Sequence, residues 1–159
     1  METLGFADIV GPIMVGPSSS HTAGALRIAR MARSLLAAAP ARAEFTLYGS
    51  FAHTQSGHGT DKALIAGLLD LPPWDERLRG SFELAKKAGL RYRFVPTDLG
   101  EDAHPNTVRF DILCKDGSRH TVTGASVGGG QVEISEIDAL RVRFTGERPI
   151  IVCRHHDHP

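Results

Sequence analysis

Cysteine is scarce in this sequence. The 159 residues include only two, Cys114 and Cys153, and neither belongs to a Cys-x-x-Cys pair. Two thiols are too few for a disulfide framework. They are also too few to hold an iron–sulfur cluster within this chain, because such a cluster usually takes about four cysteinyl ligands. Cys114 lies in an alternating apolar pattern, so we expect it to be a small buried residue on one face of a strand.

An excess of either charge is also absent, since Lys+Arg and Asp+Glu both number 18. A general nucleic-acid-binding domain is usually basic, so this balance argues against nucleic acid as a partner. It also gives no reason to expect binding to an anionic membrane surface. No apolar run approaches the ~18 residues of a membrane-spanning helix, and the first residues lack the features of a secretory signal. We therefore expect a cytoplasmic protein without membrane association.

Hydrophobic periodicity predicts mainly helices in the first half of the chain and strands in the second. Three helices are expected, over residues 20–39, 61–70 and 75–88. Thr60 would be the N-cap of the second helix, and Gly89 the C-cap of the third. Strands are expected over residues 44–50, 90–96, 107–115, 118–127, 132–137, 140–145 and 149–153. This order predicts an α+β domain, with the helices packed on one face of a mixed, mainly antiparallel sheet.

The most informative stretch runs from Gly11 to Ala25 and reads GPIMVGPSSSHTAGA. A Gly-Pro dipeptide leads into a polar cluster at the expected start of the first helix: Ser18, Ser19, Ser20, His21 and Thr22. One hydroxyl suffices to cap a helix, whereas four stand here within five residues. Free backbone N–H groups and the helix dipole favour an anion at the same place. This excess predicts a binding site for an amino acid or another small anion.

Two further polar loops carry histidines. His58 stands between two glycines within an expected loop over residues 51–59, where the backbone can approach a ligand closely. Histidine can act as a general base near neutral pH. In the third loop, His104-Pro105-Asn106-Thr107, Asn106 offers both a donor and an acceptor. We expect the three loops to meet in one site.

The chain resembles the β chain, or N-terminal β domain, of bacterial iron–sulfur L-serine dehydratases, also called L-serine deaminases. Four segments carry the resemblance in this order: GPSSSHTAGALRIARMA, GSFAHTQSGHGTDKALIAGLL, HPNTVRF and SVGGG. The resemblance covers nearly the whole chain. It implies a fold like the allosteric substrate-binding domain of some phosphoglycerate dehydrogenases. It also implies a β domain over residues 1–147, followed at residues 148–159 by the start of an ACT domain that is otherwise absent.

The resemblance implies a function as well. Proteins of this family convert L-serine to pyruvate and ammonia, a reaction of serine catabolism that feeds gluconeogenesis. Their [4Fe–4S] cluster is carried by a partner α chain, which implies that this chain is inactive alone; a homodimer is also implied. His58 would be the base that removes the Cα proton, with Thr60 beside it, and His104 and Asn106 would border the site. The substrate carboxylate or amino group would be held by Ser18, Ser19, Ser20, His21 and Thr22.

Other functions fit the residues less completely. A pyridoxal-phosphate mechanism is not favoured, because none of the four lysines lies in a loop typical of a Schiff base. A non-catalytic module that senses serine would use the same polar helix start, but it would not need a histidine base at position 58. A dimerisation scaffold would explain neither the serines nor the glycines. No metal site is predicted from the histidines near the C-terminus, whose spacing matches no strong pattern: His155, His156 and His158.

Overall fold

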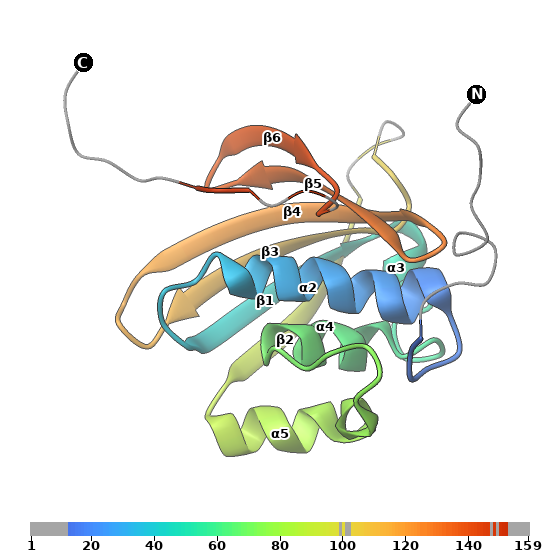
Figure 1. Cartoon of the computed structure of the whole chain (residues 1–159), viewed down its shortest axis with the longest axis horizontal. Coiled ribbons are helices and arrows are strands. Elements are labelled where there is room, and N and C mark those ends of the chain that lie inside the picture. Colours follow the sequence, from blue (N-terminus) through green and yellow to red (C-terminus); the bar gives the residue numbers. More distant parts are fainter. Residues whose placement is uncertain (1–12, 99, 101–102, 147, 149, 153–159) are drawn as a thin grey trace.

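The computed structural model describes residues 13–98, 100, 103–146, 148 and 150–152 (Figure 1). The first half contains η1 (Ser19–Gly24), α2 (Ala25–Ser34), β1 (Pro40–Tyr48), α3 (Gly49–His53), α4 (Thr60–Leu68), η2 (Glu76–Gly80) and α5 (Ser81–Ala88). The second half contains β2 (Arg91–Thr97), β3 (Thr107–Cys114), β4 (Arg119–Gly128), β5 (Gln131–Ile137) and β6 (Leu140–Phe144). None of the helices within these ranges is long and apolar enough to cross a membrane.

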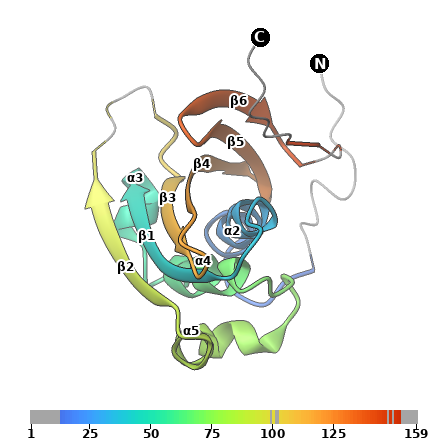
Figure 2. The same ribbon diagram turned by 90° about the vertical axis from the view of Figure 1, so that its left-hand side faces the viewer.

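One sheet organises the domain. Its six strands follow the order β2-β1-β3-β4-β5-β6. β1 pairs with β2 in parallel, and every other neighbouring pair is antiparallel. The sheet curves around α2, with α4 packed beside that helix (Figure 2). The expected α+β class, with helices packed on a mixed and mainly antiparallel sheet, is therefore confirmed.

The core fills the space between the sheet and the two central helices. Alternate residues of β1 and β3, such as Phe45 and Phe110, are fully buried and meet edge to face at 5.4 Å. Leu26 of α2 and Leu64 of α4 are also fully buried. Burial of each such side chain stabilises the fold by roughly 1.5–3 kcal/mol. Cys114 is only 2% exposed at the end of β3, which confirms that it is a small core residue.

The first helix is shorter than its alanine-rich sequence predicts. It ends at Ser34 rather than near Ala39, and β1 begins at Pro40 rather than at residue 44. The cause is sheet pairing: Lys115 donates its backbone N–H to the Ala39 carbonyl at 2.9 Å, and Pro40 lies opposite Cys114. Tertiary pairing with β3 thus outweighs the local preference of three alanines for a helix.

Three other local expectations are wrong. The N-cap of α4 is Gly59, with φ 69°, and not Thr60, which is the first helical residue and is fully buried. Residues 49–53, expected as the end of a strand and the start of a loop, form the short helix α3. Residues 150–152 are not in a strand; positions 149 and 153 of that expected strand lie outside the described residues.

Candidate active site

The three polar loops meet at one end of the molecule, where α2 begins and α3 lies (Figure 1). The imidazole rings of His21 and His58 lie with their centroids 5.1 Å apart. Thr22 Oγ1 donates a hydrogen bond of 2.8 Å to the carbonyl oxygen of His58. The third loop joins through Pro105, whose carbonyl accepts a bond of 3.3 Å from the Phe51 N–H. The tertiary structure therefore brings together residues that the sequence places in separate segments.

The polar cluster of residues 18–22, which we call the serine cluster, lies at the start of a π-helical turn. Ser18 is the N-cap, and its Oγ accepts a 3.1 Å bond from the His21 N–H. The Ser18 carbonyl accepts from the N–H groups of both Thr22 and Ala23, at 2.9 and 3.3 Å. Single π-turns of this kind are frequent at functional sites. The hydroxyls of Ser18 and Thr22 are thus engaged within the protein, while Ser19 and Ser20 are half-buried at the start of the turn.

His21 is held from several sides. Its Nε2 lies 2.9 Å from Ser50 Oγ, and its Nδ1 lies 3.4 Å from Ser18 Oγ. The ring also meets Phe51 edge to face at 5.6 Å. Burial lowers the pKa of His21 below its ordinary value of 6.5, and the nearby His58 lowers it further. A neutral imidazole is therefore favoured here near pH 7, with one ring nitrogen as donor and the other as acceptor.

Ser50 was not among the residues that the sequence singled out. It lies in α3, directly after Gly49, at the carboxyl end of β1. Gly49 has a φ of 54°, and a Cβ at this position would lie 2.7 Å from Pro105 Cα. Glycine thus lets the third loop pack on α3 while Ser50 points to His21. The only available signal was its place in the segment GSFAHTQSGHGT, just after a strand.

His58 is exposed, and its loop is anchored at both sides. Besides the Thr22 bond to its carbonyl, the His58 N–H donates to the Thr54 carbonyl at 3.2 Å. Thr60 differs, because it is fully buried and its Oγ1 has no hydrogen-bond partner within the described part of the chain. Asp61 follows in the first turn of α4, where burial raises the pKa of its carboxyl group. Of these side chains, that of His58 is open to a ligand.

The third loop forms hydrogen bonds with β4 near the end of that strand. His104 is exposed, and its Nδ1 accepts from the Asn106 N–H at 3.1 Å. The Ser126 N–H donates to the Asn106 carbonyl at 3.0 Å, and Asn106 Nδ2 donates back to the Ser126 carbonyl at 3.4 Å. Asn106 Oδ1 and Ser126 Oγ are buried without a hydrogen-bond partner among the described residues. Buried polar atoms without a partner are unusual in a folded protein.

Ser126 also links this loop to the serine cluster. A Cβ at Gly24 would lie 2.1 Å from Ser126 Oγ, so only glycine allows η1 to approach β4 this closely. Ser126 lies in the SVGGG segment, but nothing in its local pattern identified it as a site residue.

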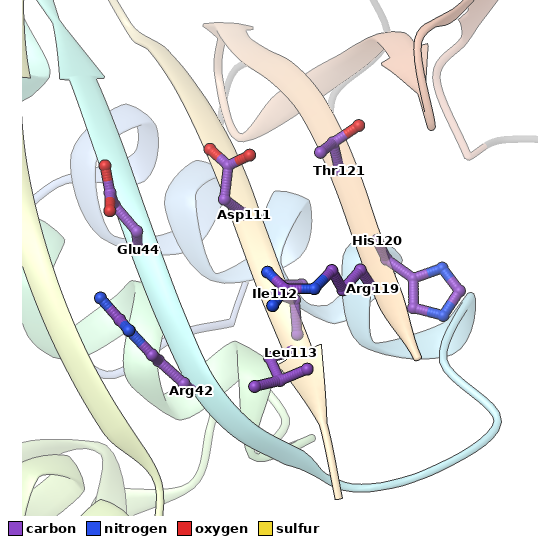
Figure 3. Close-up of a pocket in the computed structure, with 8 residues that line it drawn as sticks. All are labelled: Arg42, Glu44, Asp111, Ile112, Leu113, Arg119, His120 and Thr121. Atoms are coloured by element: carbon purple, nitrogen blue, oxygen red, sulfur yellow. The ribbon is translucent and has the colours of Figure 1, made fainter. Parts of the chain in front are cut away.

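A separate depression of about 270 Å³ lies on the sheet (Figure 3). Glu44 and Asp111 stand side by side there on β1 and β3. Glu44 already pairs with Arg93, and Asp111 with Arg109. None of the candidate-site residues lines this depression, and its paired charges are typical of a solvated sheet face. Within the described ranges, no three His, Cys, Asp or Glu side chains gather in a way that could hold a metal ion.

Comparison with known proteins identifies relatives that match most of the chain. Residues 7–80 match the family model "Serine dehydratase beta chain". The chain is 48% identical over 148 residues to "L-serine dehydratase, beta chain" of Peptoniphilus asaccharolyticus, covering 93% of this chain and 67% of that protein. The chain belongs to the serine dehydratase β-chain family. The "Probable L-serine dehydratase, beta chain" of Bacillus subtilis (strain 168) is 46% identical over 150 residues, covering 94% of this chain and 67% of that protein.

This serine dehydratase β-chain sequence also matches a longer protein. The "L-serine dehydratase" of Helicobacter pylori (strain J99 / ATCC 700824) is 33% identical over 179 residues, covering 91% of this chain and 38% of that protein. The chain thus spans about two thirds of the β-chain relatives and a smaller part of the longer one. The resemblance expected from the sequence motifs is confirmed. The match to residues 7–80 includes the serine cluster and the His58 loop.

Proposed function

We propose that this chain supplies one half of the active site of an L-serine dehydratase, which converts L-serine to pyruvate and ammonia. A partner α chain completes that site. Family membership supports the reaction. The observation that carries the proposal is the pairing of His21 and His58 at 5.1 Å, beside the serine cluster.

His58 is the proposed base. The Cα proton of serine is weakly acidic, so its removal needs a base placed against it and stabilisation of the charge that develops. His58 is exposed at the meeting point of the loops, and the Thr22 bond fixes its backbone. His58 takes the Cα proton, and the β-hydroxyl leaves as hydroxide, which one proton converts to water. The enamine that remains, 2-aminoacrylate, tautomerises to an imine, and water hydrolyses the imine to pyruvate and ammonia. Thr60, being buried, is assigned to positioning the start of α4 rather than to contact with serine.

The serine cluster is the proposed site for the substrate carboxylate or amino group. Because Ser18 and Thr22 already bond within the protein, we assign them to positioning His21 and the His58 loop. Ser19 and Ser20 are then the hydroxyls assigned to direct contact. His21 is assigned to positioning as well, because Ser50 Oγ lies 2.9 Å from its Nε2 and Ser18 Oγ lies 3.4 Å from its Nδ1.

Asn106 is the proposed contact of the third loop, with His104 at its border. Asn106 Oδ1 and Ser126 Oγ are buried acceptors without a partner among the described residues. Ser126 Oγ packs against Gly24, so it is not assigned to the substrate. The contact is assigned to the half-buried Asn106 amide, whose Nδ2 makes only a long 3.4 Å bond to the Ser126 carbonyl.

The [4Fe–4S] cluster implied by the resemblance is assigned to the α chain. The residues present here do not fit it, since Cys114 is 2% exposed within the core of the sheet and two cysteines fall short of the usual ligand number. The part assigned to this chain is therefore substrate binding and removal of the Cα proton. We further propose a cytoplasmic homodimer, with a β domain over residues 1–147 and an ACT-like segment beginning at residue 148.

Co-expression with the matching α chain under anaerobic conditions tests the function. L-serine should then yield pyruvate, and His58→Ala should reduce turnover by at least ~100-fold, the lower end of what general bases contribute, while cluster absorbance is retained. The matched control is His53→Ala, an exposed histidine in the preceding helix, which should leave turnover unchanged. An unchanged maximal rate for His58→Ala, with an altered dependence on serine concentration, would instead identify a serine-sensing module.

A further inference from the structure

An exposed apolar patch lies next to the candidate active site. It consists of Ile13, Pro17 and Trp74, and we call it the Trp74 patch. Ile13 is 83% exposed and Trp74 is 63% exposed, and Pro17 is also exposed. The Val15 N–H donates a 2.8 Å bond to the Pro73 carbonyl, which joins the two segments. Ile13 and Trp74 therefore belong to one part of the surface although they are far apart in the sequence.

The patch is continuous with the serine cluster. From Val15 the chain runs through Gly16 and Pro17 directly into Ser18. Gly16 packs against Thr22, since a Cβ at Gly16 would lie 2.5 Å from Thr22 Cγ2. The loop that follows α4 returns to the end of the molecule at which α2 begins (Figure 1). The patch therefore borders the place where the three loops meet.

The composition of the patch is that of a protein-binding surface. Tryptophan is strongly enriched among the residues that dominate binding energy, and it presents 150–250 Å² of surface that contact can bury. An ion pair between Asp75 and Arg77 stands directly beside Trp74. An apolar centre with a polar rim is the usual anatomy of an interface.

The position of the patch indicates its occupant. His58 and His104 are both exposed in this chain, yet removal of a Cα proton is favoured where water is excluded. A protein that covers His58 and His104 must also contact the surface beside them, which includes the Trp74 patch. We propose that the Trp74 patch is the surface on which the α chain of the dehydratase docks. This inference rests on the proposed function.

Trp74 is the only tryptophan in the chain, which allows a direct test. The full-length chain is labelled with 5-fluorotryptophan and observed by fluorine NMR, alone and with unlabelled, cluster-loaded α chain. We expect one resonance, whose position differs between H₂O and D₂O when the chain is alone. Addition of the α chain should shift this resonance and remove the solvent difference, because the indole becomes buried.

Variants measure the contribution of the patch to binding. Trp74→Ala and Ile13→Ser should each weaken association with the α chain, Trp74→Ala by roughly thirtyfold as expected of a dominant interface residue. Leu140→Ala is the matched control, because Leu140 is 70% exposed on the edge strand β6 and lies outside the patch. At saturating α chain, kcat should be unchanged in all three variants.

An active complex in which Trp74 stays sensitive to solvent would overturn the inference and leave the proposed function standing. Shielding of Trp74 in the chain alone would also overturn it: shielding at all concentrations would mean that this chain covers the patch itself, and concentration-dependent shielding would identify a second copy. Failure of the wild-type pair to form pyruvate would instead remove the proposed function, and with it the reason to expect the α chain.

Discussion

Ser50 Oγ lies 2.9 Å from Nε2 of His21. The bond joins the first residues of η1 to α3 and orients the imidazole toward His58. The sequence could not predict this bond, because the two residues are 29 positions apart along the chain.

Removal of the Ser50 hydroxyl should impair turnover without unfolding the protein. Ser50→Ala frees the His21 ring to rotate, and we expect kcat to fall about tenfold, the equivalent of one hydrogen bond of ~1.4 kcal/mol. Ser50→Thr, which keeps a hydroxyl, should recover part of the rate. Ser56→Ala, an exposed serine of the loop that follows α3, is the control. Wild-type kcat in Ser50→Ala would show that His21 needs no such support.

The lowered pKa of His21 should make stability depend on pH. Below pH 6.5 the unfolded chain takes up a proton at this position before the folded chain does. Its contribution to stability is therefore present above pH 6.5 and is lost as the pH falls through that value toward the lowered pKa of the folded state. Urea denaturation between pH 7.5 and 5.5 should show a smaller loss in His21→Gln than in wild type. Equal losses in both would contradict a neutral, half-buried ring.

Asp61 should make the stability of the protein depend on pH in the opposite direction to His21. Burial raises the pKa of this carboxyl above its ordinary 3.8, so the folded chain holds the proton more tightly than the unfolded chain. Stability is then lost as the pH rises from 3.8 through the raised pKa. Asp61→Asn keeps an oxygen for the Lys62 N–H bond and should lose less stability than wild type between pH 4 and 7. A greater loss in Asp61→Asn would show that the carboxylate stabilises α4 through its charge.

Gly24 offers a test of the contact between η1 and β4. By helix propensity alone, Gly24→Ala should stabilise the protein, since alanine is favoured by ~1 kcal/mol. The contact with Ser126 reverses this, and we expect a loss of roughly 1–3 kcal/mol. Gly80→Ala is the control, because a Cβ there meets its nearest atom only at 3.6 Å. Adding Ser126→Gly should relieve the Gly24→Ala penalty; purely additive losses would mean that the two positions do not clash.

Much of the fold could be predicted, because many of its elements follow from patterns among residues close together in the sequence. The alternation in β3 identified its buried face, with Val108, Phe110, Ile112 and Cys114 inside. Gly89 ended α5 as expected, with a φ of 72°. These features depend on residues close together in the sequence. The start of β1 at Pro40 depends on β3, which lies far along the chain, and local helix propensity therefore misled the prediction there.

The sequence by itself determined which loops are candidates for the active site, since clustered hydroxyls and a histidine between glycines are unusual wherever they occur. Only the tertiary structure decided which of these groups are engaged within the protein and which remain open to a ligand. It occupies Ser18 and Thr22 with internal hydrogen bonds, buries Thr60, and adds Ser50 and Ser126 to the site. The reason is that a hydroxyl is free or engaged according to what packs against it, and here those neighbours come from distant strands and helices.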